Sequence, residues 1–201
     1  DYCIDVCAAP GGKSLYLAEK TGEKGLVDAR DLTEYKAELI RENAERLQAE
    51  NIKVSVRDAC VPDKASEGQA DVLLADLPCS GLGVLGKKTD LKYRMSREQQ
   101  QELAALQRKI LSVVQAYVKP GGILIYSTCT ICQAENEENV RWFLEQYPYE
   151  AVSMEDCLPE ELLRELSRQQ EEKPGVGFQK NTVRQGYLQL LPGMQRCDGF
   201  F

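Results

Sequence analysis

The sequence contains no histidine and no long apolar run. Without histidine the chain cannot form a Ser-His-Asp triad or a zinc site with histidine ligands. No apolar stretch approaches the roughly 18 residues that span a bilayer, and no basic segment followed by an apolar signal core stands near Asp1. We therefore expect a cytoplasmic protein with no membrane partner.

A basic surface is also lacking, because 32 acidic residues outweigh 25 lysines and arginines and give a net charge of −7. Such a chain is not built mainly to hold phosphates. If it binds RNA, it needs a local basic patch or help from another domain. Its 201 residues, 43% of them hydrophobic, predict one domain over residues 1–201 with an apolar core of its own.

A disulfide framework and a metal centre are both disfavoured, although the chain has eight cysteines. A chain with an adequate core and no secretory signal does not need disulfides. Cys129 and Cys132 form one C-x-x-C pair, which is typical of half a zinc knuckle or of a redox pair. The second C-x-x-C that a zinc site requires is missing, so we expect no metal.

Strand-like and helix-like segments alternate along the chain, which predicts an α/β fold with a mostly parallel, doubly wound sheet. Thr33 and Ser96 are the expected helix N-caps. In such sheets ligands bind beyond the carboxyl ends of the strands. The expected strands are residues 2–6, 25–29, 52–56, 72–75 and 123–126, with an antiparallel final strand at 187–191; the expected helices are 14–20, 33–48, 96–118, 135–146 and 159–170, followed by a loop at 173–177.

A loop of small residues joins the first strand to the first helix. Two glycines let its backbone approach a ligand closely, and the amides that open the helix point toward that ligand. The pattern is neither a phosphate P-loop nor a dinucleotide G-x-G-x-x-G, and it favours a carboxylate-bearing cofactor, with an ordinary tight turn as the alternative. The loop consists of Cys7, Ala8, Ala9, Pro10, Gly11, Gly12 and Lys13.

Two carboxylates follow the next two expected strands. Asp31 ends the second strand, where a carboxylate can accept hydrogen bonds from the hydroxyls of a ribose, although a helix cap or a solvated residue is the alternative. Asp58 follows the third strand with the same ambiguity and can contact an adenine edge. Together with the glycine loop, the two residues predict a nucleoside cofactor.

Two cysteines stand at the ends of strands that we expect to be neighbours. Cys79 follows Asp76 and Pro78 after the fourth strand, and Cys129 follows the fifth. A single free cysteine is usually a small buried apolar residue. Two of them at paired strand ends, beside an Asp-x-Pro sequence, instead predict a shared reactive pocket.

The motifs as a set resemble the RNA cytosine-5 methyltransferases of the Sun/Fmu/nucleolar-protein-one family. The stretch from residue 81 onward is similar to the members that act on small-subunit ribosomal RNA. The matching stretches are CAAPGGK (7–13), DLPCSGLGVLGKKTDLKY (76–93), LQRKIL (106–111), VKPGGILIYSTCTI (118–131), ENEENV (135–140) and DGFF (198–201).

The resemblance implies a Rossmann-like fold that uses S-adenosylmethionine to methylate C5 of a cytosine in RNA. Cys129 would add to C6 of the base, and Cys79 would assist release of the product. Asp76 would hydrogen-bond the base near N3 or N4 and lie next to the cofactor, while Pro78 shapes the base slot. The glycine loop, Asp31 and Asp58 would hold the methionine, ribose and adenine parts of the cofactor.

Several basic residues have roles that remain open. Lys13 can lower the pKa of Cys129, or it can be a solvated lysine in the first turn of a helix. A cluster after the fourth strand can bind phosphates or form a solvated loop. That cluster consists of Lys87, Lys88, Lys92 and Arg94.

The resemblance also implies that residues 1–201 are a catalytic domain and a fragment. Members of the family generally carry an N-terminal RNA-binding domain, which would explain how an acidic domain holds RNA. One alternative is a catalytically silent RNA-binding or assembly module with the same fold, although such a module has no need for two cysteines and Asp76. Another is a zinc- or redox-active protein based on Cys129 and Cys132.

Overall fold

The computed structural model describes residues 1–172, 180–194 and 197–201, which fall into two units. Unit 1 comprises Asp1–Pro78 and Ala105–Ser127, and unit 2 comprises Cys79–Ala104 and Thr128–Phe201.

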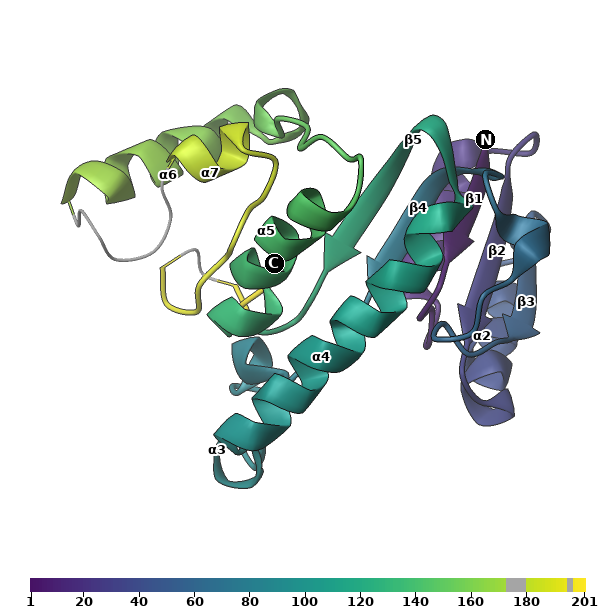
Figure 1. Ribbon diagram of the computed structural model, residues 1–201, viewed down its shortest axis with the longest axis horizontal. Helices are drawn as coiled ribbons and strands as arrows, with labels where there is room; N and C mark the ends of the chain where they lie inside the picture. Colours follow the sequence, from purple (N-terminus) through teal and green to yellow (C-terminus); the bar gives the residue numbers. More distant parts are fainter. Residues whose placement is uncertain (173–179, 195–196) are drawn as a thin grey trace. The chain divides into compact units, whose positions relative to one another are not determined.

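Unit 1 contains a five-stranded sheet in which every neighbouring pair of strands is parallel (Figure 1). The strand order is β3-β2-β1-β4-β5, so the topological switch point of the sheet, where the strand order reverses, lies between β1 and β4. Side chains of the inner strands, such as Ile4, Val27 and Leu73, are fully buried, as expected of a parallel sheet covered on both faces. The strands are β1 (Tyr2–Asp5), β2 (Leu26–Asp31), β3 (Ile52–Val56), β4 (Ala70–Asp76) and β5 (Val118–Ser127).

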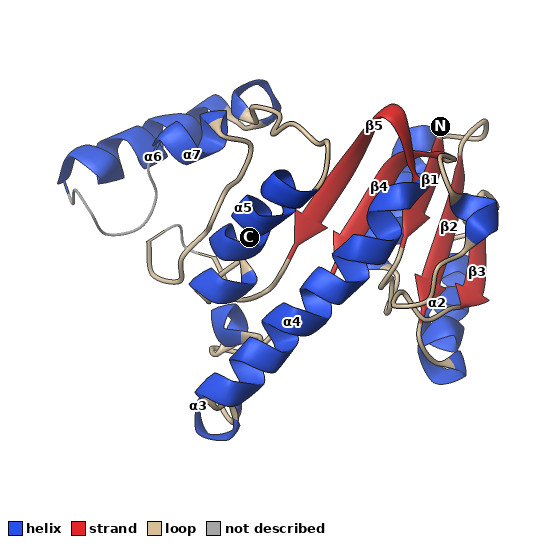
Figure 2. Ribbon diagram, in the orientation of Figure 1, coloured by secondary structure: helices blue, strands red, loops and turns tan. Residues whose placement is uncertain are grey.

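Helices cover both faces of this sheet (Figure 2). α1 (Gly12–Thr21) and α2 (Glu34–Arg46) pack against β2 and β3. The Thr33 hydroxyl accepts a hydrogen bond from the Lys36 amide at 3.3 Å, which confirms Thr33 as the N-cap of α2. Ile40 of α2 is buried with Ala8 and Ala29, so the helix anchors the glycine loop as well as the sheet.

The predicted long helix at 96–118 is shorter in the structure. α4 (Arg97–Val114) is followed by a 3₁₀ turn at Gln115–Tyr117, and Val118 already belongs to β5. Ser96 caps α4 in a reciprocal arrangement: the Gln99 amide donates to its hydroxyl at 3.2 Å, and its own amide donates to Gln99 Oε1 at 2.9 Å.

Short helices and loops build unit 2. A small apolar core forms around Leu166 and Val183, with Leu162, Leu163 and Leu188 packed against it. The predicted loop at 173–177 lies outside the described residues. The helices are α3 (Leu91–Arg94), α5 (Glu137–Gln146), α6 (Glu160–Glu172) and α7 (Lys180–Arg184), together with the first residues of α4.

The predicted strand at 187–191 does not form among the described residues. That segment makes only an isolated antiparallel bridge, in which Leu190 and Phe200 exchange backbone hydrogen bonds. Pro192 has no amide hydrogen, so it cannot continue the ladder. The sheet is therefore parallel throughout. Across the described ranges, no helix combines the length and apolar character that spanning a membrane requires.

Candidate active site

The glycine loop of unit 1 is held against the ends of β1 and β2. The Ala8 amide donates to the Arg30 carbonyl at 2.9 Å. Gly11 has a φ of 106°, and a Cβ there would lie 3.2 Å from Ile40 Cγ2, so backbone conformation and packing explain this glycine. A Cβ on Gly12 would meet no atom within 4 Å. The open space at Gly12, where α1 begins, fits a ligand that approaches the backbone closely.

Asp31 is buried at the carboxyl end of β2 and is not a helix cap. Its Oδ2 accepts from the Ala9 amide at 2.9 Å, and its Oδ1 accepts from the Leu32 amide at 2.7 Å and from Lys36 Nζ at 3.0 Å. A carboxylate offers about four acceptor positions, so one remains for a ligand hydroxyl. Lys36 is half-exposed, and its movement would free a second.

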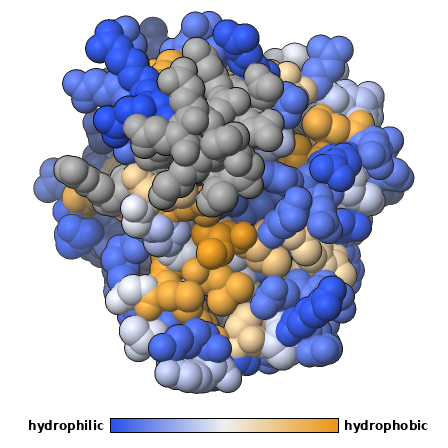
Figure 3. Space-filling view, turned by 90° about the vertical axis from the view of Figure 1, so that its left-hand side faces the viewer, coloured by the Kyte–Doolittle hydropathy of each residue, from blue (hydrophilic) through white to orange (hydrophobic). Residues whose placement is uncertain are grey.

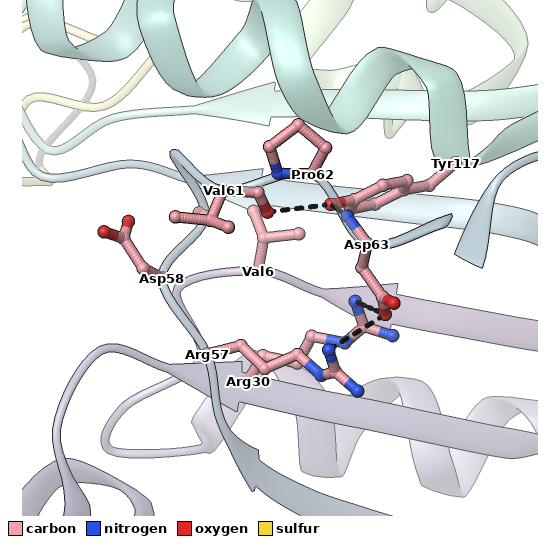
Figure 4. Close-up of a pocket in the computed structure, with 9 residues that line it drawn as sticks. Val6, Arg30, Arg57, Asp58, Val61, Pro62, Asp63 and Tyr117 are labelled. Atoms are coloured by element: carbon pink, nitrogen blue, oxygen red, sulfur yellow. Dashed lines mark hydrogen bonds and ion pairs between the residues drawn. The ribbon is translucent and has the colours of Figure 1, made fainter. Parts of the chain in front are cut away.

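Asp58 lies beside a cavity of about 80 Å³ after β3. Its Oδ1 accepts from the Cys60 amide at 2.8 Å. In Figure 4 its carboxylate points away from Asp63, which pairs with Arg30 and Arg57 at 3.4 and 3.2 Å. Ligand pockets usually measure about 300–1,000 Å³, so this cavity is too small to enclose a nucleoside cofactor by itself.

Asp5, at the end of β1, is a site residue that the sequence analysis did not single out. It is buried and accepts hydrogen bonds from Ser14 Oγ at 2.6 Å and from the Cys7 amide at 3.4 Å. Burial raises the pKa of Asp5 to about 6, although these hydrogen bonds oppose the rise. Its position offered a signal, because Asp5, Asp31 and Asp76 all stand at carboxyl ends of strands.

The raised pKa of Asp5 predicts a specific pH dependence of stability. Between pH 4 and pH 6 the folded state keeps a proton that the unfolded state releases, so the contribution of Asp5 is lost as the pH rises through this range. We compare the unfolding free energy of Asp5→Asn with that of the unaltered protein at each pH. We expect this difference to shift in favour of the variant by roughly 2 kcal/mol from pH 4 to pH 7.5. Urea unfolding at both pH values tests this, with the exposed Asp156→Asn as control; a difference that does not change with pH would contradict it.

Asp76, at the end of β4, binds two side chains of unit 1. Lys13 Nζ lies 2.5 Å from its Oδ2, and Ser127 Oγ donates to its Oδ1 at 2.7 Å. Lys13 therefore contacts a carboxylate and is not simply a solvated lysine. The Pro78 carbonyl accepts from Gln107 Nε2 at 2.8 Å, which fixes the chain just beyond Asp76.

The two predicted cysteines meet in unit 2. Cys79 Sγ lies 3.2 Å from Cys129 Sγ, and the Cys129 amide donates to Cys79 Sγ at 3.3 Å. The hydrogen bond to Cys129 and burial raise the pKa of Cys79 above that of an ordinary thiol, so Cys79 keeps its proton at neutral pH. The predicted juxtaposition of Cys79 and Cys129 is confirmed by this geometry.

Neither Cys132 nor Cys7 shares this arrangement. Cys132 Sγ donates to Gln100 Oε1 at 3.4 Å, whereas the sulfur of Cys129 lies against that of Cys79. Within the described ranges no three cysteine or acidic side chains are grouped as metal ligands. Burial and the carboxylates of Asp31 and Asp5 raise the pKa of Cys7 to about 12, which keeps it a thiol.

The predicted basic cluster lies in and just before α3. Lys87 pairs with Asp198 at 2.6 Å, and Arg94 pairs with Asp90 at 3.2 Å. Within the described part of the chain, Lys88 and Lys92 form no ion pair. Lys92 Nζ lies 4.7 Å from the ring centroid of Tyr93, whose side chain is 82% exposed.

Apolar side chains are exposed together on one face of the molecule (Figure 3). Besides Tyr93, unit 2 exposes Ile131, Val152 and Phe200. A basic segment that carries an exposed aromatic ring has the two features that single-stranded nucleic acids bind, which are cations for phosphates and a flat surface for bases.

The fold and the site define a class of protein. A parallel sheet in the order β3-β2-β1-β4-β5, with a glycine loop after β1 and an acidic residue ending β2, is a Rossmann-like arrangement of the kind that binds nucleoside cofactors at the carboxyl ends of its strands. A SAM-dependent O-methyltransferase from Thermotoga maritima has the same fold, with a TM-score of 0.53 at 19% identity over 76% of this chain and 48% of that one. The predicted fold class is confirmed.

The chain belongs to the 16S rRNA methyltransferase RsmB/F family, whose model matches residues 1–201. The probable ribosomal RNA small subunit methyltransferase B of Bacillus subtilis is 39% identical over 201 residues, which are 98% of this chain and 41% of the relative. The crystal structure of NSun6 from Pyrococcus horikoshii with SFG has a TM-score of 0.75 at 28% identity, over all of this chain and 46% of that one. The predicted family and the predicted cofactor, S-adenosylmethionine, are confirmed.

The chain spans about two fifths of the length of the curated relatives that it matches.

Proposed function

We propose that the full-length protein transfers a methyl group from S-adenosylmethionine to C5 of a cytosine in small-subunit ribosomal RNA, in the cytoplasm. The observation that carries this proposal is the contact between Cys79 and Cys129 at 3.2 Å. Two thiols at hydrogen-bond distance have a use in chemistry that makes and then breaks a bond from sulfur to the base. A catalytically silent module has no use for such a pair.

Cytosine C5 is a weak nucleophile, so the first step activates the ring. The Cys129 thiolate forms a bond to C6, and the electrons of the C5–C6 double bond become available at C5. When bound, S-adenosylmethionine supplies an electrophilic methyl group for C5. Transfer of the C5 proton to a base then lets the electrons of the C5–H bond restore the double bond, and Cys129 leaves C6 as a thiolate.

Cys79 has the properties of a partner for this chemistry. Because its pKa is raised, Cys79 is the protonated member of the pair and can donate an S–H hydrogen bond to the Cys129 sulfur. That hydrogen bond stabilises a thiolate at Cys129 in a chain that has no histidine to do so. When product leaves, Cys79 assists the departure of Cys129 from the methylated base.

Unit 1 supplies the groups that we assign to the cofactor and the base. The open space at Gly12 would take the methionine end, Asp31 a ribose hydroxyl and Asp58 the adenine edge. Asp76 would hydrogen-bond the base near N3 or N4, next to the cofactor, and offset charge as the adduct forms. Lys13 holds the Asp76 carboxylate in place.

RNA is held in this proposal by the basic segment of unit 2 together with an N-terminal RNA-binding domain of the full-length protein. The net charge of −7 supports the need for that second contribution. The target base must also leave its stack to reach Cys129.

We expect Lys88→Ala and Lys92→Ala each to weaken RNA binding and to reduce the slope of log affinity against log salt by about one. Each lysine would lose one phosphate contact, whereas the exposed lysine of Lys24→Ala, in unit 1, would not. Fluorescence anisotropy of the full-length protein with labelled ribosomal RNA fragments, measured from low to high salt, tests this. If the slope is the same in Lys88→Ala, Lys92→Ala and Lys24→Ala, then Lys88 and Lys92 do not contact RNA phosphates.

Methyl transfer from labelled S-adenosylmethionine to ribosomal RNA by the full-length protein tests the function as a whole. The expected result is label in 5-methylcytosine of small-subunit RNA that requires Cys129. Label in another base, or none in RNA, would contradict the proposal.

A further inference from the structure

The loop that carries Cys129 is fixed through its backbone. The Thr128 amide donates to the Phe201 carbonyl at 3.1 Å, and the Phe201 amide donates back to the Thr128 carbonyl at 3.0 Å. The Cys129 carbonyl accepts from the Gly83 amide at 3.0 Å. Two segments of unit 2 that are distant from this loop in sequence, at Gly83 and at Phe201, therefore hold it through backbone hydrogen bonds.

A single buried amide bridges the two residues that flank Cys129. Asn136 is fully buried. Its Oδ1 accepts from the Thr128 hydroxyl at 2.7 Å, and its Nδ2 donates to the Thr130 carbonyl at 3.0 Å and to Gln189 Oε1 at 2.7 Å. Because a buried amide gains most when its donors and acceptor are all satisfied, this bridge resists displacement.

The residue before Asn136 holds the loop of the other thiol. Glu135 is fully buried, and its Oε2 accepts from the amide of Ser80, the residue after Cys79, at 2.9 Å. Ser80 Oγ and Thr130 Oγ1, which lie 2.7 Å apart, link the two loops directly. A buried carboxylate is costly, so its presence calls for a role that an apolar residue could not fill.

We propose that Glu135 and Asn136 are positioning residues, whose side chains hold the loops of Cys79 and Cys129 so that the two sulfur atoms meet. Both residues stand where a 3₁₀ turn, Gln133–Glu135, leads into α5, so one short element sets both loops. The hydrogen bonds of Glu135 and Asn136 account for the short distance between the two sulfur atoms, and this part of the proposal does not depend on the reaction. The catalytic consequence rests on the proposed function.

Alkylation of the full-length protein by dibromobimane measures the thiol separation without RNA. Each of two neighbouring thiols loses its proton to solvent, forms a carbon–sulfur bond and displaces one bromide ion. Peptide mass spectrometry then gives the ratio of product bridging Cys79 and Cys129 to product attached to one of them. This ratio reports the effective concentration of one thiol at the other.

We expect mostly bridged product in the unaltered protein and a ratio at least about tenfold lower in Glu135→Ala and Asn136→Ala. Glu135→Gln keeps an oxygen for the Ser80 amide and should remain close to the unaltered protein. Asn51→Ala is the matched control, because the Asn51 amide bridges the carbonyls of Ala18 and Gly22 in unit 1 at 2.8 and 2.9 Å.

If Asn136→Ala fails to fold, Asn136→Asp replaces it, because aspartate keeps the shape and the acceptor for Thr128 but has no amide donor for Thr130. The same fall in the bridged ratio is then expected. An unchanged ratio in the Glu135 and Asn136 variants, or an unaltered protein that yields no bridged product, would overturn the proposal.

Steady-state methyl transfer separates this proposal from the proposed function. Positioning of the reactive thiols predicts a fall in kcat that parallels the bridged ratio, with an unchanged KM for S-adenosylmethionine and recovery in Glu135→Gln. A fall in bridging without a fall in kcat would refute the proposed use of the thiols and leave their positioning by Glu135 and Asn136 established.

Discussion

Full-length protein carrying Cys129→Ala should transfer no measurable methyl group to small-subunit ribosomal RNA. Without the sulfur that bonds to C6, cytosine C5 remains too weak a nucleophile to accept the methyl group, however well the base and cofactor are held. Loss of a residue that forms a covalent intermediate typically lowers kcat by more than about 10,000-fold. Incorporation of labelled methyl groups into RNA under single-turnover conditions measures the loss.

Cys157→Ala is the matched control for this loss, since Cys157 is an exposed, free cysteine of unit 2. Its rate should equal that of the unaltered protein. Binding of S-adenosylmethionine by Cys129→Ala, measured by calorimetry, should also be unchanged, because the cofactor residues that we assign lie in unit 1. Substantial methyl transfer by Cys129→Ala would contradict the covalent mechanism.

Cys79→Ala is expected to have a different phenotype, the accumulation of a covalent RNA–protein complex. Cys129 can still add to C6, and the methyl group can still be transferred, but release of Cys129 loses its partner. Turnover should fall by about 100-fold or more, the usual size of a lost acid–base contribution. Denaturing gel electrophoresis with labelled RNA should reveal a slowly migrating complex in this variant.

The double variant Cys79→Ala/Cys129→Ala tests whether Cys129 forms the covalent bond in that complex. If Cys129 makes the bond, the double variant forms no complex, and Cys129→Ala alone forms none either. A Cys79→Ala enzyme that turns over at the normal rate without a complex would show that product release does not need Cys79.

Local patterns predicted the part of the fold that places the cofactor residues. The β-branched run at Ile52–Val56 and the Thr33 cap specify their elements within a few residues, and Asp31 ends β2 as expected. The prediction of a final strand at 187–191 was wrong: among the described residues this segment pairs with another only at the single Leu190–Phe200 bridge. Pairing is a non-local property that the pattern of one segment does not contain.

The contact between Cys79 and Cys129 was predictable for a topological reason. The two residues follow adjacent parallel strands, β4 and β5, whose register pairs Asp76 with Ser127. Adjacent strand ends bring side chains within reach, although the two cysteines are far apart in sequence. The distance of 3.2 Å between the sulfur atoms was not predictable, because it depends on the turn and helix start at Glu135 and Asn136.

The contacts of charged side chains also could not be predicted from the sequence. Nothing near Lys13 in the chain indicates that its ammonium binds Asp76, because that contact depends on the separation of β1 and β4 in space. The place of Asp5 at a strand end could have marked it as a candidate, but its raised pKa was beyond prediction, because it arises from burial, which the folded chain alone determines.

A bond between Cys129 and C6 of the target cytosine can be trapped with a fluorinated substrate. Small-subunit RNA with 5-fluorocytidine at the target position gives up no proton from C5, so the adduct cannot break down after methyl transfer. Digestion of the complex with the full-length protein and mass spectrometry of the linked peptide identify the bonded residue. We expect a methylated nucleotide attached to Cys129; attachment to Cys79, or no covalent product, would contradict the covalent role of Cys129.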